Sequence, residues 1–429
     1  MDSGSTVAVE LNRYSEPYVV KAQPRPLRVL TFTSLFPNGQ QSLHGIFVGE
    51  RIRALSRLCE IQVVAPVPWT PPTRVLGKRY FGYSRVLREE VHQGLLLRHP
   101  RFIVFPKFFK SIDGILMAAS CVWALSAIRE SFSFDIIDAH WAYPDGVAAA
   151  ILADYFQVPL ALTVRGDDIN VLPNFFWRRQ LIRWALRKAA VVIALSNELK
   201  ERVVTLTTPT LVSNTTVIPN GVNSEIFHPG NQAAARRRLG FPEQGRILLS
   251  VGRLHNSKGY PLLVAALARL QEKFPDLCLV IVGESDHEAD ARPSIEIAAR
   301  RLGVSEKITL AGAKPHSVVA DWYRAADLFC LPTFREGSAN VLLEALACGL
   351  PCVTTPVGGN PEIISTPDVG ILVAPEVEQL TRAIARGLAC SWDQQRISAH
   401  VRKRTWSNVA AECCQQLSQA AGLNRQRPE

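Results

Sequence analysis

Short apolar runs alternate with helical patterns along the whole chain. In the first half these runs are residues 28–33, 61–66, 134–139, 160–164 and 191–195, and in the second half 246–251, 278–282, 308–311 and 328–331. A loop with glycine and then a helical pattern follow the first run of each half. This order of strand, loop and helix is typical of doubly wound α/β domains, in which ligands bind at the carboxyl ends of parallel strands. A chain of 429 residues with 47% hydrophobic residues can fill about two or three such domains.

An Asn-Gly pair at Asn220 and Gly221 is a strong turn signal between the two α/β halves. We therefore predict a hinge near Gly221 and a first domain over residues 27–221. The second domain is predicted over residues 222–405, followed by a helix at 406–423 that crosses back to the first domain. Residues 1–26 and 424–429 are expected to be disordered tails.

The most informative stretch, residues 332–362, carries two carboxylates, Glu336 and Glu344, eight positions apart. A helix that starts near Asn340 would hold Glu344 in its first turns and leave Glu336 on the entering loop. The start of a helix favours phosphate, and carboxylates beside a phosphate suit the hydroxyls of a ribose and a sugar. This pattern predicts a nucleotide-sugar site with Ser338, Asn340, Val341 and Glu344 around the donor. The alternative is a capping pair on a surface helix.

The loop after the first strand of the second half adds two cations, Arg253 and Lys258, between Gly252 and Gly259. Two cations at such a point can neutralise a diphosphate and stabilise it as it leaves. Gly283 and Lys314, which follow the next two strands, are candidate contacts for the base. The chain has no G-x-G-x-x-G, so a dinucleotide fingerprint is missing.

Candidate residues of the first half also follow strands. Gly45 would let the backbone approach a diphosphate closely, or it is only a turn glycine. His140 ends the strand at 134–139, where function usually lies in this architecture. Arg165 and Asp168, after the strand at 160–164, are candidate acceptor contacts, although the aspartates of this loop could instead cap the next helix.

These motifs resemble the retaining glycosyltransferases of family 4, which have the GT-B fold of two Rossmann-like domains facing across a cleft. The likeness rests on Glu-x7-Glu at Glu336 and Glu344, on Gly-Arg-x4-Lys-Gly at residues 252–259, and on GLPCVTTPVGGNPEII at residues 349–364. The segment at 141–170 resembles the branch that builds bacterial surface polysaccharides such as teichuronic acid. The chain departs from the family at Ser338 and Ala339, where an aromatic residue and a proline are common, so the sugar pocket is expected to differ in shape.

The resemblance implies transfer of a sugar from a nucleotide-diphosphate donor to an acceptor with retention at the anomeric carbon. In this scheme Arg253 and Lys258 stabilise the leaving diphosphate, and Glu336 orients the sugar. Glu344 holds the ribose, and His140 contacts the sugar from the first domain. The rivals are a nucleotide-sugar epimerase of the same architecture, a sugar phosphorylase and a nucleic-acid-binding protein, the last supported only by the charge.

We expect no metal ion and no other cofactor, because no D-x-D sequence occurs and the nine cysteines form no zinc pattern. These cysteines are expected to be reduced thiols in the cytoplasm. No secretory signal opens the sequence, and the longest apolar run, residues 114–128, is shorter than the roughly 20 residues of a bilayer span. That run is predicted to be a core helix.

The net charge of +10 indicates an acidic partner. Much of it lies between residues 74 and 110, where Arg74, Lys78, Arg79, Arg85, Arg88, Arg98, Arg101, Lys107 and Lys110 alternate with seven Tyr and Phe residues. Such a segment suits an anionic membrane surface, to which the basic helix at 175–188 could add, or it is a solvated loop with core aromatics. A lipid-linked glycan acceptor at the inner face of the cytoplasmic membrane would fit the first alternative.

Overall fold

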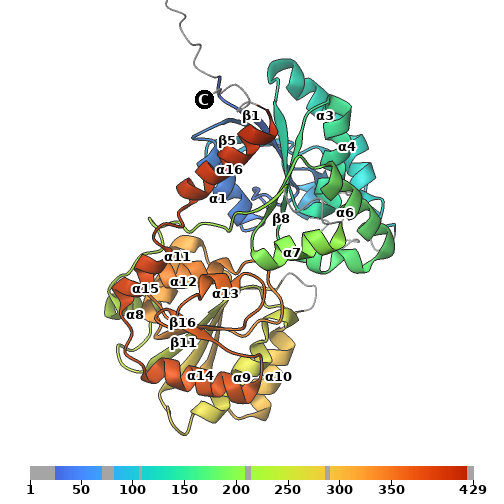
Figure 1. The fold of residues 1–429 in the computed structure, drawn as a ribbon. Helices are drawn as coiled ribbons and strands as arrows, with labels where there is room; N and C mark the ends of the chain where they lie inside the picture. The colour runs from blue at the N-terminus through green and yellow to red at the C-terminus, as the bar shows by residue number, and fades with distance from the viewer. Residues whose placement is uncertain (1–24, 70–81, 106–108, 208–213, 286–289, 423–429) are drawn as a thin grey trace, which may run out of the picture.

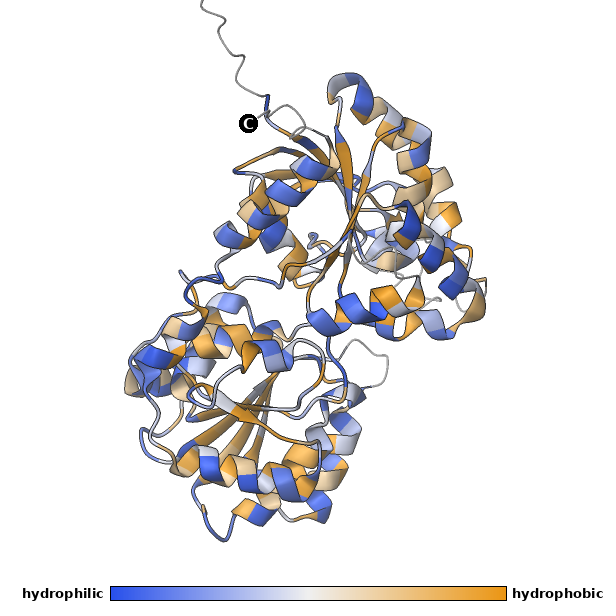
Figure 2. Ribbon diagram, in the orientation of Figure 1, coloured by the Kyte–Doolittle hydropathy of each residue, from blue (hydrophilic) through white to orange (hydrophobic). Residues whose placement is uncertain are grey.

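The computed structural model describes residues 25–69, 82–105, 109–207, 214–285 and 290–422. The predicted tails fall almost wholly outside these ranges, as do Arg74, Lys78, Arg79 and Lys107 of the basic segment. Two large β-sheets organise the described chain, one in each half, and helices cover both (Figure 1). The strands are hydrophobic, whereas polar residues gather on the outer helices (Figure 2).

The first sheet has eight strands in the order β10-β9-β8-β7-β1-β2-β5-β4. Their bounds are β1 Arg28–Phe32, β2 Glu60–Val64, β4 Glu89–His92, β5 Leu95–Arg98, β7 Ile136–His140, β8 Leu160–Val164, β9 Val191–Ala194 and β10 Thr215–Val217. All pairs are parallel except the β4–β5 hairpin at the edge. A separate small sheet pairs β3 (Val67–Pro68) with β6 (Arg101–Phe102).

The second sheet has six parallel strands in the order β13-β12-β11-β14-β15-β16. These are β11 Arg246–Val251, β12 Leu277–Val282, β13 Ile308–Gly312, β14 Leu328–Leu331, β15 Cys352–Thr354 and β16 Gly370–Leu372. The strands predicted from the apolar runs of both halves therefore all form. In both sheets the carboxyl ends of the central strands carry the loops of the predicted site.

Helices α3 (Asp113–Ser131), α4 (Val147–Phe156) and α6 (Phe176–Lys188) pack on one face of the first sheet and share one hydrophobic core. The other face carries α1 (Ile46–Leu55) and α16 (Trp406–Ala420). The short helices η2 (Ala142–Gly146), α5 (Asp167–Asn170) and η3 (Leu172–Asn174) and the helix α7 (Asn197–Leu206) complete this half.

The second sheet is covered by α8 Gln232–Leu239, α9 Tyr260–Leu270, α10 Arg292–Arg301, α11 His316–Ala325, α12 Asn340–Ala347, α13 Asn360–Ile363, α14 Val377–Ala389 and α15 Gln394–Val401, with the short turns η5 Asn256–Lys258 and η6 Ser305–Lys307. Helix α12 begins at Asn340, as the spacing of the two glutamates predicts. Glu336 therefore lies on the entering loop and Glu344 inside the helix.

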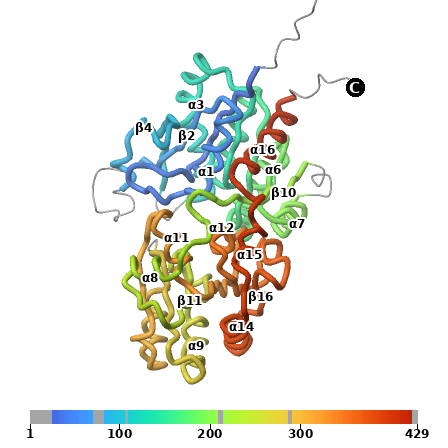
Figure 3. Tube along the Cα trace, turned by 90° about the vertical axis from the view of Figure 1, so that its left-hand side faces the viewer, coloured from blue at the N-terminus to red at the C-terminus, as the bar shows by residue number. Residues whose placement is uncertain are grey.

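The chain crosses between the halves twice, and the two crossings lie side by side. Val222 donates its N–H to the carbonyl of Arg404 at 2.9 Å, and Val222 pairs with Thr405 as an isolated β-bridge. From there α16 returns to the first sheet and packs against α1 (Figure 3). The C-terminal helix thus crosses back as the sequence predicts.

Helix α3 differs from the prediction of a core helix. Its inner face is buried through Met117, Cys121 and Leu125, but Ile115 and Trp123 are 46% and 82% exposed. The apolar run therefore reflects two apolar faces, of which only one contacts the core. No helix in the described part of the chain has the length and apolar character to cross a bilayer.

Candidate functional site

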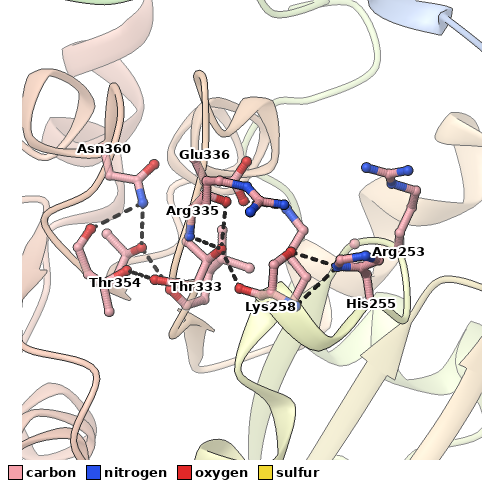
Figure 4. A network of polar contacts seen from close by, with 12 residues as sticks. Arg253, His255, Lys258, Thr333, Arg335, Glu336, Thr354 and Asn360 are labelled. Atoms are coloured by element: carbon pink, nitrogen blue, oxygen red, sulfur yellow. Dashed lines mark hydrogen bonds and ion pairs between the residues drawn. The ribbon is translucent and has the colours of Figure 1, made fainter. Parts of the chain in front are cut away.

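Two loops of the second half bring Lys258 and Glu336 together. Lys258 ends η5, the turn between β11 and α9, and Glu336 lies between β14 and α12. Nζ of Lys258 forms an ion pair with Oε1 of Glu336, and the two side chains are only 15% and 12% exposed (Figure 4). The predicted cation and the first predicted carboxylate are therefore direct partners in the structure.

The two loops approach each other through their backbones. Phe334 donates its N–H to the carbonyl of Ser257 at 2.8 Å. A Cβ at Gly259 would lie 2.1 Å from the carbonyl oxygen of Pro332, and Gly259 has a φ of 70°. Only glycine allows this close approach. The Lys-Gly pair of the sequence motif thus combines a charge with the contact that positions it.

The segment after β15 is hydrogen-bonded to the loop that carries Glu336. Nδ2 of the buried Asn360 lies 3.1 Å from both Oγ1 of Thr354 and the carbonyl of Thr355. The hydroxyl of Thr355 donates in turn to the carbonyl of Thr333 (Figure 4). These bonds tie Asn360 of the sequence GGNPE to the loop that carries Glu336.

Arg253 lies on the β11 loop, beyond His255 as seen from the Lys258–Glu336 pair (Figure 4). Gly252 starts this loop, and Gly283 follows β12 beside it. Lys314, after β13, is partly exposed. The predicted phosphate and base contacts therefore follow three neighbouring strands.

Glu344 is buried with only 4% of its surface exposed. The hydroxyl of Tyr323 donates to its Oε2 at 2.8 Å, and Nε2 of His316 lies 3.9 Å from its Oε1. Burial raises the pKa of Glu344 to about 8, against the lowering effect of the Tyr323 hydrogen bond. The carboxyl group is thus held in one orientation, and its burial favours the protonated form.

The start of α12 holds the other predicted donor residues. Asn340 is buried, and Val341 is partly buried beside it. Oγ of Ser338 is buried and has no hydrogen-bond partner among the described residues. A hydroxyl in this state is available for a ligand oxygen.

His140 lies in a buried polar chain of the first half. Its Nε2 is 3.2 Å from Oδ2 of Asp138, and its Nδ1 is 3.3 Å from a guanidinium nitrogen of Arg165. Since Arg165 only donates, Nδ1 accepts and the ring proton lies on Nε2. Burial lowers the pKa of His140 to about 4, so the ring is neutral.

This placement corrects the prediction that His140 contacts the sugar through its side chain. The side chain has no exposed surface, and both ring nitrogens already have partners. In this arrangement the imidazole positions Arg165. The guanidinium continues the chain, because its second nitrogen lies 3.4 Å from Oδ1 of Asn220.

Asp168 does not fit the predicted role as an acceptor contact. It is fully buried, and its carboxylate accepts hydrogen bonds from the N–H groups of Ala142, Arg165 and Gly166 at 2.9, 3.0 and 2.7 Å. The alternative, that the carboxylate caps the local backbone, agrees with this arrangement. Asp168 fixes the loop that carries Arg165.

Gly45 precedes α1 with a φ of 65°, and a Cβ there would lie 2.3 Å from the backbone of Leu35. The alternative that Gly45 is only a turn glycine accounts for this geometry. The neighbouring Phe47 contacts His316 of the second half with ring centroids 5.9 Å apart. The Gly45 turn therefore lies at the boundary between the two sheets, near the side where Glu344 is buried.

The two halves meet through polar contacts close to these residues. Nδ2 of Asn220 donates to Oδ1 of Asn340 at 2.9 Å, and Nε of Arg335 lies 2.8 Å from Oδ1 of Asp167. On the α7 side, the N–H of Asn197 donates to Glu362 at 2.7 Å, and the N–H of Gly358 to Glu198 at 2.6 Å. The series of side-chain contacts from Asp138 through His140, Arg165 and Asn220 thus reaches Asn340, the first residue of α12.

His316, Tyr323 and Asn220 are not among the site residues predicted from the sequence. His316 follows β13 at its carboxyl end, which is the signal that identified His140. Tyr323 lies seven positions later, two turns along the same helix, and so faces Glu344 too. The Asn-Gly pair at Asn220 predicts only a turn, and nothing in its local sequence indicates the bond to Asn340.

In the described ranges, no group of three or more His, Cys, Asp or Glu side chains could hold a metal ion. The nine cysteines are free thiols. Two of them, Cys59 and Cys414, lie 3.3 Å apart between the first sheet and α16.

Comparisons with known proteins agree with the architecture and the motifs. Residues 231–404 match the family model of glycosyl transferases group 1, and residues 45–226 match the model of glycosyltransferase family 4. The chain is 30% identical over 366 residues to a protein of Bacillus subtilis named as a teichuronic acid biosynthesis glycosyltransferase, covering 84% of this chain and 89% of the relative. It is 30% identical over 359 residues to a D-inositol 3-phosphate glycosyltransferase of Thermobispora bispora, covering 77% and 82%.

Solved structures confirm the predicted GT-B arrangement. The Anabaena protein HepE, solved in complex with UDP and glucose, superposes with a TM-score of 0.64 at 19% identity and covers 94% of this chain and 100% of its own. A likeness at this identity shows the fold. Together with the family models and the relatives, it identifies this chain as a glycosyltransferase enzyme that belongs to family 4.

Proposed function

We propose that the chain transfers a sugar from a nucleotide-diphosphate sugar to a glycan acceptor, with retention at the anomeric carbon and without a metal ion. The observation that carries this proposal is the direct pairing of Lys258 with Glu336, on the loop that enters the helix of the buried Glu344. A cation for a diphosphate and two carboxylates for hydroxyls are the groups that such a donor requires. HepE, which has the same fold, was solved with UDP and glucose, so a uridine nucleotide is the first donor to test.

The donor lies along the carboxyl ends of β11 to β14 in this proposal. Arg253 and Lys258 neutralise the diphosphate, and the start of α12 with Ser338, Asn340 and Val341 adds backbone donors. Glu344 accepts hydrogen bonds from the ribose, held in place by Tyr323. Glu336 orients the sugar after Lys258 turns from the carboxylate to the phosphate. Gly45, Gly252, Gly283 and Lys314 border the nucleotide.

Transfer with retention follows if the acceptor attacks from the face that the diphosphate leaves. The departing phosphate oxygen takes the acceptor proton, and the two cations stabilise the charge that develops on the diphosphate. No side chain of the protein then forms a covalent bond to the sugar. Among the residues of the first half, Arg165 contacts the acceptor in this proposal. His140 positions Arg165 through its hydrogen bond to the guanidinium.

The acceptor is a lipid-linked glycan of surface polysaccharide synthesis in this proposal, at the inner face of the cytoplasmic membrane. The relative named for teichuronic acid biosynthesis supports this class. The relatives named as D-inositol 3-phosphate glycosyltransferases favour a second candidate, a phosphorylated polyol. Both classes fit a chain with an excess of positive charge.

The test is a transfer assay with a nucleotide sugar and either a polyprenyl-linked glycan or an inositol phosphate. NMR of the product reports the configuration at the anomeric carbon. We expect a retained configuration and a rate that a chelator does not change. An inverted product, or activity lost with chelator and restored by magnesium, would overturn the corresponding part of the proposal, and donor turnover without any acceptor would favour an epimerase.

A further inference from the structure

The outer face of α3 is apolar along most of its length. Its exposed positions include Ile112 just before the helix and then Ile115, Ala119, Trp123 and Ala127, which recur every three or four residues and so lie on one side. Trp123 is 82% exposed and Ile115 46%. Soluble helices present polar residues to water on this side, so this stripe indicates a covering partner.

A second apolar group lies where α6 begins. Phe175, Phe176 and Trp177 follow one another and are 53%, 61% and 69% exposed. Three consecutive large aromatic side chains at a helix start do not serve the core, which α6 contacts through Ile182, Ala185 and Leu186. They require the same explanation as the α3 stripe.

The buried Tyr143 links the start of α3 to the start of α6, and α4 packs between the two helices along the rest of their length. The hydroxyl of Tyr143 donates to the carbonyl of Lys110, just before α3, and the guanidinium of Arg178 in α6 lies 5.8 Å from its ring centroid. Both helices also lie on the same outer side of the first sheet, opposite α1 and α16 (Figure 1). We call this surface, formed by the exposed residues 109–127 of α3 and its approach and 175–179 of α6, the α3/α6 face.

The α3/α6 face is basic. Within the face, α6 contributes Arg178 and Arg179 and no acidic residue, whereas Arg183, Arg187 and Lys188 lie further along the helix, where Lys188 pairs with Asp154 of α4. On the α3 side Lys110 pairs with Asp113, whose side chain is only 12% exposed. Aromatic side chains between cations match the headgroup layer of an anionic bilayer, where the rings insert and the cations meet lipid phosphates.

We propose that the α3/α6 face binds the surface of an anionic lipid bilayer, with the aromatic residues inserted about 5 to 10 Å deep. A second copy of the chain fits less well, because a two-fold interface would oppose the basic residues of one copy to those of the other. Tyr143 follows His140 by three residues, so the bilayer would lie next to the loops of the first half that carry Arg165. The inference rests on the proposed function only in that a lipid-linked acceptor gives this contact a purpose.

Sedimentation with vesicles tests the proposal directly and needs no donor. Vesicles of phosphatidylcholine alone are compared with vesicles containing one third phosphatidylglycerol. We expect binding to the anionic vesicles only, at least tenfold weaker for the double variant Phe176→Ser/Trp177→Ser. Arg179→Gln should weaken binding about fivefold. All three side chains are exposed, so the fold should tolerate the changes.

The matched control is Ile297→Ser/Arg300→Gln on α10 of the second half, where Ile297 is 57% exposed. It should bind vesicles like the wild type. Equal binding by the control and by the aromatic double variant would overturn the proposal, and so would a dimer in sedimentation equilibrium that only the double variant loses. Nucleotide-sugar binding by the same proteins is measured separately, so a failure of the donor proposal would appear there and leave the vesicle result intact.

Discussion

Nζ of Lys258 and Oε1 of Glu336 form an ion pair although their loops follow different strands, β11 and β14. Both side chains are mostly shielded from water, so each charge depends on the other for its compensation. A donor diphosphate would take over Lys258 and leave Glu336 to the sugar hydroxyls. In the proposed mechanism, the pair keeps both groups in place until the donor binds.

Replacement of Glu336 and replacement of Lys258 should have different effects on transfer and on nucleotide binding. Glu336→Gln should lower transfer about 100-fold or more while nucleotide diphosphate affinity changes little, because in the proposed site the carboxylate contacts the sugar and not the phosphates. Lys258→Met should lower both. Calorimetric titration with the free nucleotide and steady-state transfer rates separate the two effects. Equal loss of nucleotide affinity in both variants would contradict these roles.

Lys258→Met should also lower the free energy of unfolding by about 1 to 3 kcal/mol, because it leaves the shielded Glu336 carboxylate without its partner. Urea unfolding of the variant and the wild type measures this. The double variant Lys258→Met/Glu336→Gln should recover part of the loss. No recovery would show that the ion pair contributes little to stability.

Glu344 predicts a pH dependence of stability. Burial raises its pKa to about 8 in the folded protein, whereas an unfolded glutamate has a pKa of about 4.3. Between these values the folded state holds a proton that the unfolded state lacks. The stabilising contribution is therefore complete below about pH 4.3 and is lost as the pH rises to about 8, by up to roughly 1.4 kcal/mol per pH unit. Glu344→Gln does not titrate, so its Tm should rise relative to wild type between pH 5 and 8, and parallel Tm curves would refute the burial effect.

Tyr323 orients the same carboxyl group. Tyr323→Phe removes the hydroxyl that donates to Oε2 at 2.8 Å, so the KM for the donor should rise about fivefold with a smaller change in kcat. Trp322→Phe is the control, since Trp322 is a buried neighbour on α11 that packs on Phe241 instead. The control should lower stability without changing KM. A KM change of the same size in both variants would reduce Tyr323 to a packing residue.

Gly337 tests the contact between the two halves. A Cβ at this position would lie 2.0 Å from the carbonyl oxygen of Arg165. Gly337→Ala should hold the halves apart, raise the radius of gyration in small-angle scattering and increase donor hydrolysis relative to transfer, because water is excluded less well. Gly82→Ala is the control, since no atom lies within 4 Å of a Cβ there. Unchanged scattering and product ratio in Gly337→Ala would show that this contact does not control closure.

The sequence was sufficient for features that depend on local pattern. Apolar runs predicted the strands, and the spacing of Glu336 and Glu344 predicted where α12 begins. The partnership of His140 with Asp138 and Arg165 could not be predicted, because a histidine after a strand has the same local sequence whether it faces a ligand or the interior. Asp168 shows the same difficulty, since only the fold reveals that three N–H groups surround its carboxylate.

Composition was ambiguous for α3 and for the basic aromatic segment. An apolar helix has the same sequence pattern whether its second face is covered by protein or exposed. Only the structure shows that Trp123 lies on an exposed face. In the described part of the basic segment, Tyr83 and Phe102 are core residues, whereas Phe105 and Phe109 are exposed. The alternative of core aromatics therefore holds for Tyr83 and Phe102, and the membrane contact stays a prediction.

Thermal stabilisation by nucleotide sugars tests the central claim most directly. Wild type and Glu344→Ala are heated with UDP-, GDP-, ADP- and dTDP-sugars, with Ile297→Ser as a control for an unrelated surface change. A donor at about 100 times its dissociation constant should add roughly 2.7 kcal/mol to the stability of the wild type and of the control. We expect one nucleotide class to do so and to have little effect on Glu344→Ala. Equal stabilisation of Glu344→Ala, or no response of the wild type to any of the sugars, would contradict a donor site at Glu344.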